Sequence, residues 1–189
     1  MTLPALSKFI VWLRERLGKS SPSKDEKKPA FQPRSPIDLT GLVRNDDSQL
    51  SEQDYESVGM LKIHDLMNNE FVVSQGAGVE TVLRKQEGDG VNCFWLWQEK
   101  METPILIIHV NKDLTTLHYF PSDDHPGFYS EGAMPGLDPD GDTVFFMNNL
   151  TEEEEFPNYK VVPFAAALVA AKEFLASPEL PPSIEWVEL

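Results

Sequence analysis

The most regular pattern of apolar positions lies near the C-terminus and predicts a helix over residues 164–176. Pro163 precedes this run, and a proline suits the first position of a helix because its missing N–H would be unpaired there. The run is rich in alanine, which loses no side-chain entropy in a helix. The apolar residues that share one face at spacings of three and four are Phe164, Ala167, Leu168, Ala171 and Leu175. We therefore expect a core helix, ended at Ser177 by Pro178.

Shorter apolar runs before this helix predict the strands of a sheet. The expected strands are residues 60–66, 71–73, 91–98, 105–110, 115–120, 142–147 and 160–162. The run at 91–98 carries apolar side chains on both faces, and the run at 105–110 is apolar nearly throughout, as expected of a central strand. Residues 76–87 predict a helix with an inward apolar side, and residues 183–189 predict a terminal strand that joins the sheet.

Strands thus dominate the middle of this region, and helices flank them. This order indicates an α+β fold with a mostly antiparallel sheet and two flanking helices. Such a domain would occupy residues 58–189 of the 189-residue chain.

The first 57 residues follow a different pattern. Apolar residues at helical spacing, with lysines and arginines on the other side, predict a basic amphipathic helix over residues 1–18. Its apolar residues are Leu3, Leu6, Phe9, Ile10, Leu13 and Leu17. Residues 19–57 are polar and proline-rich, which is typical of a flexible linker. The helix is compatible with a membrane-surface contact through residues 3–17, with docking to a partner, or with packing on its own domain.

Charge divides the chain in the same place. Residues 1–45 hold nine Lys or Arg and four Asp or Glu, a net charge of +5. Residues 46–189 hold seven bases and 27 acids, a net charge of −20. A domain this acidic repels nucleic acids and anionic lipid and attracts basic proteins. We therefore expect a basic protein partner and no direct nucleic-acid binding.

No catalytic or metal-binding motif is complete in the sequence. A zinc-dependent nucleic-acid deaminase would need a His-x-Glu pattern with Pro-Cys-x-x-Cys, and Cys93 is the only cysteine. Cys93 lies within an apolar run, so we expect a small buried side chain, and a single cysteine favours a reducing compartment. The chain also has no apolar run long enough to span a membrane.

Two polar clusters are candidates for a metal site, and the second is also a candidate for a hydrolase site. Residues 138–142 resemble a calcium loop, but the glycine and the twelfth residue do not fit the EF-hand spacing. The second cluster of candidate ligands consists of His109, His118, His125, Asp123 and Asp124. Their spacing matches no known ligand set, and a hydrolase built on His125 would lack a nucleophile beside it. We therefore expect no metal, no cofactor and no enzymatic activity.

The order of elements in the second half of the chain carries a family resemblance. A strand at 159–162 leads into the proline-started, alanine-rich helix with its Lys-Glu-Phe-Leu segment, then a proline-bearing turn, then Ile-x-Trp-x-Glu at 184–188. Upstream segments at 105–110, 117–120, 127–130 and 142–147 agree with this order. The chain resembles the first-described family of immunity proteins from bacterial polymorphic toxin systems, often encoded beside deaminase-type toxins. The resemblance covers roughly residues 58–189.

This resemblance implies an α+β fold with characteristic Trp and Glu residues. In this sequence they would be Trp186 with either Glu188 or Glu185. It also implies a cytoplasmic protein that binds and neutralises a cognate secreted or contact-dependent toxin, a deaminase or a nuclease. The alternative hypothesis is an adaptor that residues 3–17 recruit to a membrane surface.

The acidic clusters and the aromatic residues are the candidates for contacting such a toxin. Acidic runs are usually solvated loops, but here they would face the basic cleft of the toxin in place of phosphates. Phe128 and Tyr129, in a glycine–proline loop, are the expected aromatic anchors. Trp186 has two alternatives, packing under the final helix or contact with the toxin. The predicted partner-binding residues are Asp123, Asp124, Phe128, Tyr129, Glu152, Glu153, Glu154, Glu155, Trp186 and Glu188.

Overall fold

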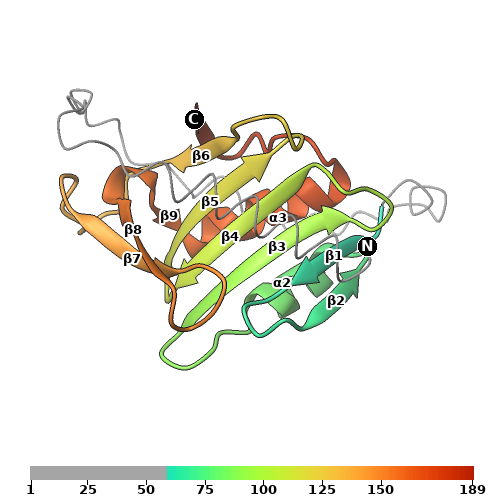
Figure 1. Cartoon of the computed structure of the whole chain (residues 1–189), viewed down its shortest axis with the longest axis horizontal. Helices are drawn as coiled ribbons and strands as arrows, with labels where there is room; N and C mark the ends of the chain where they lie inside the picture. Colours follow the sequence, from blue (N-terminus) through green and yellow to red (C-terminus); the bar gives the residue numbers. More distant parts are fainter. Residues whose placement is uncertain (1–58) are drawn as a thin grey trace. The chain divides into compact units, whose positions relative to one another are not determined.

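The computed structural model describes residues 59–189, and within them the fold is built on one large antiparallel sheet (Figure 1). Its strand order is β10-β6-β5-β4-β3-β1-β2, and β9 also pairs with β5. The strands are β1 (Leu61–His64), β2 (Glu70–Val73), β3 (Val91–Gln98), β4 (Ile105–Asn111), β5 (Leu114–Phe120), β6 (Phe128–Glu131), β9 (Val162–Pro163) and β10 (Glu185–Glu188). Every strand pair is antiparallel. The predicted amphipathic helix and linker lie outside the described residues.

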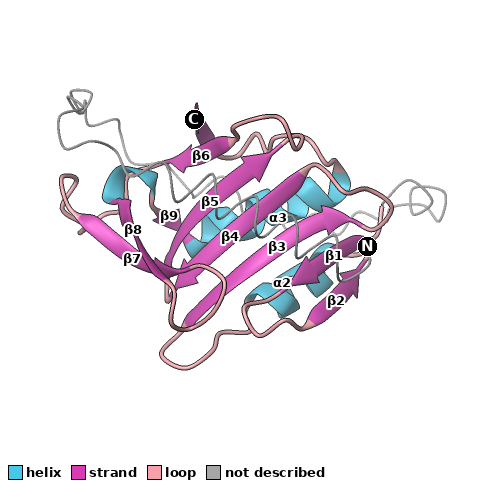
Figure 2. Cartoon of the chain, in the orientation of Figure 1, coloured by secondary structure: helices cyan, strands magenta, loops and turns pink. Residues whose placement is uncertain are grey.

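Two helices cover one face of this sheet. They are α2 (Gly76–Leu83) and α3 (Phe164–Ala176), and Figure 2 shows them on the same side of the strands. The α+β class and the two flanking helices are therefore confirmed within residues 59–189. No helix among these residues is long and apolar enough to cross a membrane.

The core lies between the helices and the sheet face toward them, which we call the helical face. Buried alanines of α3, Ala167, Ala170 and Ala171, let the helix pack closely on the strands. The strand side chains of the helical face include Leu61, Ile63, Phe94, Leu96, Leu106, Ile108, Val110, Leu117 and Tyr119. Strand β3 is buried along its whole length, as its two apolar faces predicted.

The start of α3 differs slightly from the prediction. Pro163 is the residue before the helix, with φ −62° and ψ 146°, so it stands at the N-cap and not at the first helical position. Strand β9 ends at Pro163, and the Phe164 N–H donates to the Asp113 carbonyl at 2.9 Å. The fixed φ of proline therefore sets the turn from strand to helix.

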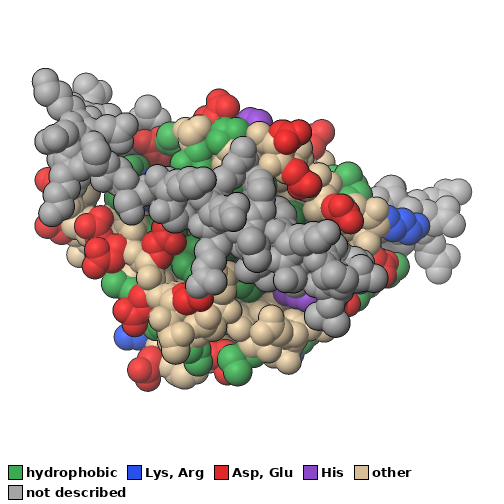
Figure 3. Space-filling view, viewed as in Figure 1, with side chains coloured by type: hydrophobic (Ala, Val, Ile, Leu, Met, Phe, Trp, Pro, Cys, Tyr) green, Lys and Arg blue, Asp and Glu red, His purple; other side chains and the backbone are tan. Residues whose placement is uncertain are grey.

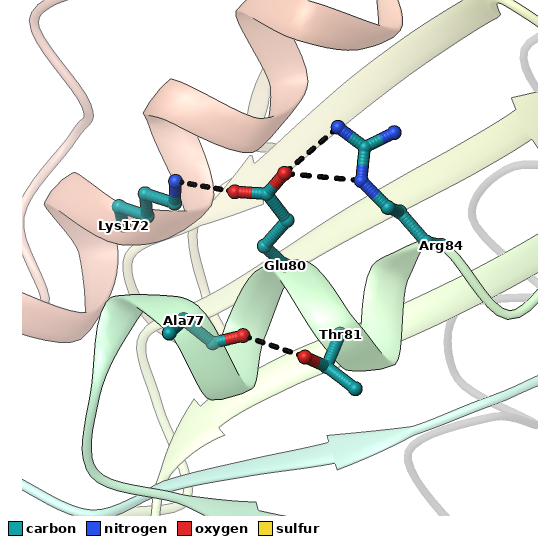
Figure 4. Close-up of polar contacts among 5 residues, drawn as sticks. All are labelled: Ala77, Glu80, Thr81, Arg84 and Lys172. Atoms are coloured by element: carbon teal, nitrogen blue, oxygen red, sulfur yellow. Dashed lines mark hydrogen bonds and ion pairs between the residues drawn. The ribbon is translucent and has the colours of Figure 1, made fainter.

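A carboxylate joins the two helices on their solvent side. Glu80 of α2 accepts hydrogen bonds from Lys172 Nζ of α3 at 2.8 Å and from Arg84 Nη2 at 2.8 Å (Figure 4). The bond from Lys172, followed by the bond from Arg84, lowers the pKa of Glu80 to about 2. This contribution to stability is present above the ordinary carboxyl pKa of 4.5 and is lost as the pH falls toward 2.

A second, two-stranded sheet consists of β7 (Asp142–Phe146) and β8 (Glu153–Pro157). The prediction included the first of these strands but not the second, because four consecutive glutamates resemble a solvated loop. The strand predicted over residues 160–162 also does not form as one element. It is divided between the 3₁₀ helix η3 (Asn158–Lys160) and the short strand β9.

Gly127 is a position where a side chain should destabilise the fold. Its φ is +101°, and a Cβ there would lie 2.8 Å from two ring atoms of the buried Phe120. We expect Gly127→Ala to lower the free energy of unfolding by about 2 kcal/mol, measured by urea denaturation. Gly136→Ala is the matched control, because Gly136 has φ +91° with no atom within 4 Å of the added Cβ. Equal losses in both variants would show that backbone strain alone, and no clash, sets the effect.

Candidate functional site

The hairpin formed by β7 and β8 lies on the sheet face opposite the helices, which we call the hairpin face (Figure 1). Successive side chains of a strand alternate between its two sides. Phe145 and Phe156 point to the inner side of the hairpin and are 0% and 2% exposed. Val144, Phe146, Glu153 and Glu155 alternate with these residues and so belong to its outer side.

Aromatic rings fasten the inner side of the hairpin to the main sheet. The ring of Phe156 lies 5.7 Å from that of His109 on β4 and 5.3 Å from that of His118 on β5. The same ring lies 5.8 Å from Phe145 and 6.3 Å from Tyr129 of β6. Ring contacts of this kind add to the burial of apolar area. Phe156 is therefore the centre of the contact between the two sheets.

Two hydrogen bonds join β7 to β4. The Nδ1 of His109 lies 3.1 Å from the Phe146 carbonyl oxygen, and Asn111 Nδ2 donates to the Val144 carbonyl at 3.0 Å. A carbonyl only accepts, so the neutral His109 ring carries its proton on Nδ1. Both carbonyls therefore already have donors.

The two histidines beneath the hairpin are neutral because they are buried. His109 and His118 are 1% and 0% exposed, with ring centroids 5.0 Å apart. Burial lowers the pKa of His109 to about 4, and the bond to the Phe146 carbonyl opposes the shift only in part. Burial lowers the pKa of His118 well below its ordinary value, with further lowering by His109 and Lys160. Both rings are therefore uncharged near neutral pH.

Glu154 differs from its neighbours in the acidic run. It points to the inner side, where burial raises its pKa and Lys160 opposes that shift. The Nζ of Lys160 lies 3.7 Å from the centre of the Tyr129 ring, and burial lowers the pKa of Lys160 while Glu154 opposes that shift. Glu153 and Glu155 are exposed. Of the predicted run, these two carboxylates are the ones directed to solvent.

The tip of the hairpin is an ordered turn. Asn149 Oδ1 accepts from the Thr151 N–H at 2.8 Å, and Asn148 Nδ2 donates to Glu152 Oε2 at 2.7 Å. The Met147 N–H closes the turn on the Glu152 carbonyl at 2.9 Å. Leu150, between these residues, is 45% exposed. The turn thus holds an apolar side chain out toward solvent.

The predicted aromatic anchors lie in a strand, whereas a loop was expected. Phe128 and Tyr129 are the first two residues of β6, so they point to opposite faces of the main sheet. Phe128 stacks on His125 with ring centroids 4.9 Å apart, on the side of the core. Tyr129 is 4% exposed, and its ring meets His118 edge-on at 4.1 Å. Packing therefore occupies both rings.

Trp186 is on the helical side as well. It is half-buried against the core, and its Nε1 donates to the Pro181 carbonyl at 2.8 Å. Glu188, two residues on, is exposed, and one of its oxygens lies 3.5 Å from His125 Nε2. Asp123 and Asp124 are exposed in the loop between β5 and β6. The predicted residues thus form no single patch but divide between the hairpin and the β6–β10 end of the sheet.

Three residues of the hairpin surface were not among the residues predicted from the sequence. They are Val144, Phe146 and Leu150. The sequence Thr-Val-Phe-Phe-Met already indicated that some of its apolar side chains face outward, because only alternate side chains of a strand can face the core. The exposure of Leu150 depends on the conformation of the turn, and no periodic pattern of apolar residues in the sequence predicts it.

The remaining candidate chemistry falls into structural roles. Cys93 is fully buried, which raises the pKa of its thiol. Asp138 accepts a backbone hydrogen bond from Gly141 at 3.0 Å in a turn. Residues 59–189 contain no group of three or more His, Cys, Asp or Glu side chains arranged to hold a metal ion.

Comparison with protein families gives one match. The model described as "Immunity protein Imm1" matches residues 67–188, which is more than half of the chain. No curated protein matches the sequence significantly. The matched region contains both helices, the hairpin and all the predicted partner-binding residues.

Proposed function

The chain belongs to the Imm1 family of immunity proteins, and from that premise we propose that it binds and neutralises a cognate toxin in the cytoplasm. The toxin would be a deaminase or nuclease domain with a basic cleft. The chain would occlude that cleft and perform no chemistry of its own. Family membership is the observation that carries this proposal.

The charge of the domain supports the cleft-blocking mechanism. Residues 59–189 contain 22 Asp or Glu and seven Lys or Arg. In Figure 3 acidic side chains appear at the left, over β7 and β8, and also along the top and upper right of the same face. A basic cleft built for nucleic acid attracts such a surface and speeds the encounter. The same charge disfavours nucleic acid as the direct ligand.

The alternative of a membrane-recruited adaptor depends on residues 3–17, which lie outside the described residues. Residues 59–189 add no observation in its favour. Their charge opposes contact with anionic lipid.

Association with the toxin should depend strongly on salt. The probe is the catalytically inactivated product of the gene adjacent to the one that encodes this chain. Between about 0.05 M and about 0.5 M salt, we expect the association rate constant to fall about tenfold or more, because screening removes the steering. Stopped-flow fluorescence measures the rate constant, and isothermal titration measures the affinity.

Two outcomes would count against the proposal in different ways. No binding at the lower salt concentration would remove the proposed function. Binding with a rate constant independent of salt would keep the function and remove the electrostatic mechanism.

A further inference from the structure

The outer side of the hairpin combines apolar and acidic side chains. Val144 lies directly across from Glu155, and Phe146 lies directly across from Glu153. The two apolar side chains are half-buried and the two glutamates are exposed. Each apolar group is therefore paired with a carboxylate on the same side. Leu150, in the turn at the tip of the same hairpin, is 45% exposed.

The hairpin presents this side because its inner side is occupied. Phe145 and Phe156 pack beneath it, so the alternating residues cannot turn inward without exposing both rings. The surface is thus a fixed consequence of the strand register.

Addition of a partner strand along the outer edge of β7 is disfavoured. The carbonyls of Val144 and Phe146 would have to accept its hydrogen bonds, but Asn111 and His109 already donate to them. At this edge of β7, a partner would therefore meet side chains of the hairpin, and not its backbone.

We propose that Val144, Phe146, Leu150, Glu153 and Glu155 form the docking surface for the toxin, and that they receive a toxin segment carrying both apolar and basic side chains. This inference rests on the proposed function and assigns its contact surface. Apolar side chains of the toxin pack against Val144, Phe146 and Leu150, while its Arg or Lys side chains pair with the two glutamates. The hairpin then takes the anchoring role first expected of Phe128 and Tyr129.

The charge of the hairpin selects a basic partner over a second copy of this chain. Residues 142–157 contain five carboxylates and no Lys or Arg. Two such surfaces brought together would place carboxylates against carboxylates. A basic segment instead gives each glutamate a partner of opposite charge.

The test compares hairpin variants with controls of matched chemistry in the full chain. The hairpin variants are Leu150→Ser, Phe146→Ala and the double variant Glu153→Gln/Glu155→Gln. The controls are Val72→Ser, at a residue 49% exposed on β2, and Glu102→Gln, at an exposed residue between β3 and β4. The probe is the inactivated product of the adjacent gene, and its Kd is measured by isothermal titration.

We expect the Kd to rise about tenfold or more for each apolar hairpin variant, as for a central interface residue. The double glutamate variant should slow association severalfold at low salt and much less at high salt. Both controls should bind like the wild type. Leu150→Ser keeps the test independent of folding, because Leu150 is a solvent-exposed turn residue.

The possible failures are distinguishable. Suppose the wild type binds the toxin, and both Leu150→Ser and the glutamate double variant bind it with the same Kd as the wild type. The docking surface is then wrong, and the proposed function stands. If the controls lose as much affinity as the hairpin variants, the loss is not specific to the hairpin, and the docking surface is again wrong. If the wild type does not bind, both proposals fail.

Discussion

Replacing Phe156 by alanine is expected to lower the free energy of unfolding by about 3–5 kcal/mol, one of the largest losses a single substitution causes. Phe156 is 2% exposed and holds the hairpin to the main sheet through His109, His118 and Tyr129. Its removal leaves a cavity that these rings cannot close without moving the hairpin. Urea denaturation monitored by circular dichroism gives the change in stability.

Phe146→Ala is the control for this substitution. It removes the same side chain from the same hairpin, but from the half-buried outer side. We expect a loss of about 1 kcal/mol or less in stability, together with the loss of toxin affinity proposed above. Phe156→Ala, in contrast, should lose far more stability than Phe146→Ala does. Equal losses of stability in the two variants would show that the hairpin does not depend on its inner ring cluster.

Local pattern was enough to predict much of the fold. Helix α3 has a strong apolar periodicity and a proline before it, and the structure confirms it over Phe164–Ala176. Strand β3 was predicted over the residues that form it, and its buried pattern follows from two apolar faces. Strand β10 was also predicted, although its partner β6 could not be identified from sequence. Each of these elements has a signal contained in its own residues.

The errors share a physical cause, which is pairing over long distances in the chain. The glutamates at 153–155 form a strand because β7 pairs with them and because Phe156 can be buried. Phe128 and Tyr129 point to opposite sides of the sheet because β6 pairs with β5 in one register. A shift of one residue would exchange their faces. Composition near these residues suggested a loop, and tertiary pairing overrode it.

The candidate site shows the same division between local and long-range information. The exposed carboxylates Glu153 and Glu155 were in the predicted set, because net charge is visible in sequence. Glu154 was predicted with them, yet it faces inward, where the charge of Lys160 acts on its pKa. The apolar half of the surface was not predicted, since Val144 and Phe146 resemble core residues. Only the register reveals that the hairpin has one buried side and one side that faces outward.

The histidine pair beneath the hairpin gives the domain a pH dependence whose sign follows from burial. Lys160 of η3 further lowers the pKa of His118, and the Tyr129 ring of β6 meets the His118 ring edge-on at 4.1 Å. Glu154 of β8 interacts with Lys160. A positive charge on either imidazole would be buried away from water, beside a second imidazole whose ring centroid is 5.0 Å from its own. Because the pKa of each imidazole is lowered on folding, the unfolded chain binds more protons below pH 6.5, and stability falls as the pH falls. Glu154 acts in the opposite direction, but only near the ordinary carboxyl pKa of 4.5.

Lowering the pH from about 7.5 to about 5 is therefore expected to cost about 2 kcal/mol of stability for His109, whose pKa is lowered from 6.5 to about 4, and His118 should add a loss of the same sign. Urea denaturation at both pH values measures this difference. In the variant His109→Asn/His118→Leu, the asparagine keeps an N–H donor for the Phe146 carbonyl and neither side chain titrates. The stability of this variant should change much less between the two pH values than that of the wild type. Glu80, with a pKa of about 2, keeps its charge throughout this range and does not contribute. An equal loss in the wild type and the variant would assign the acid sensitivity to other groups and remove the histidine pair as its cause.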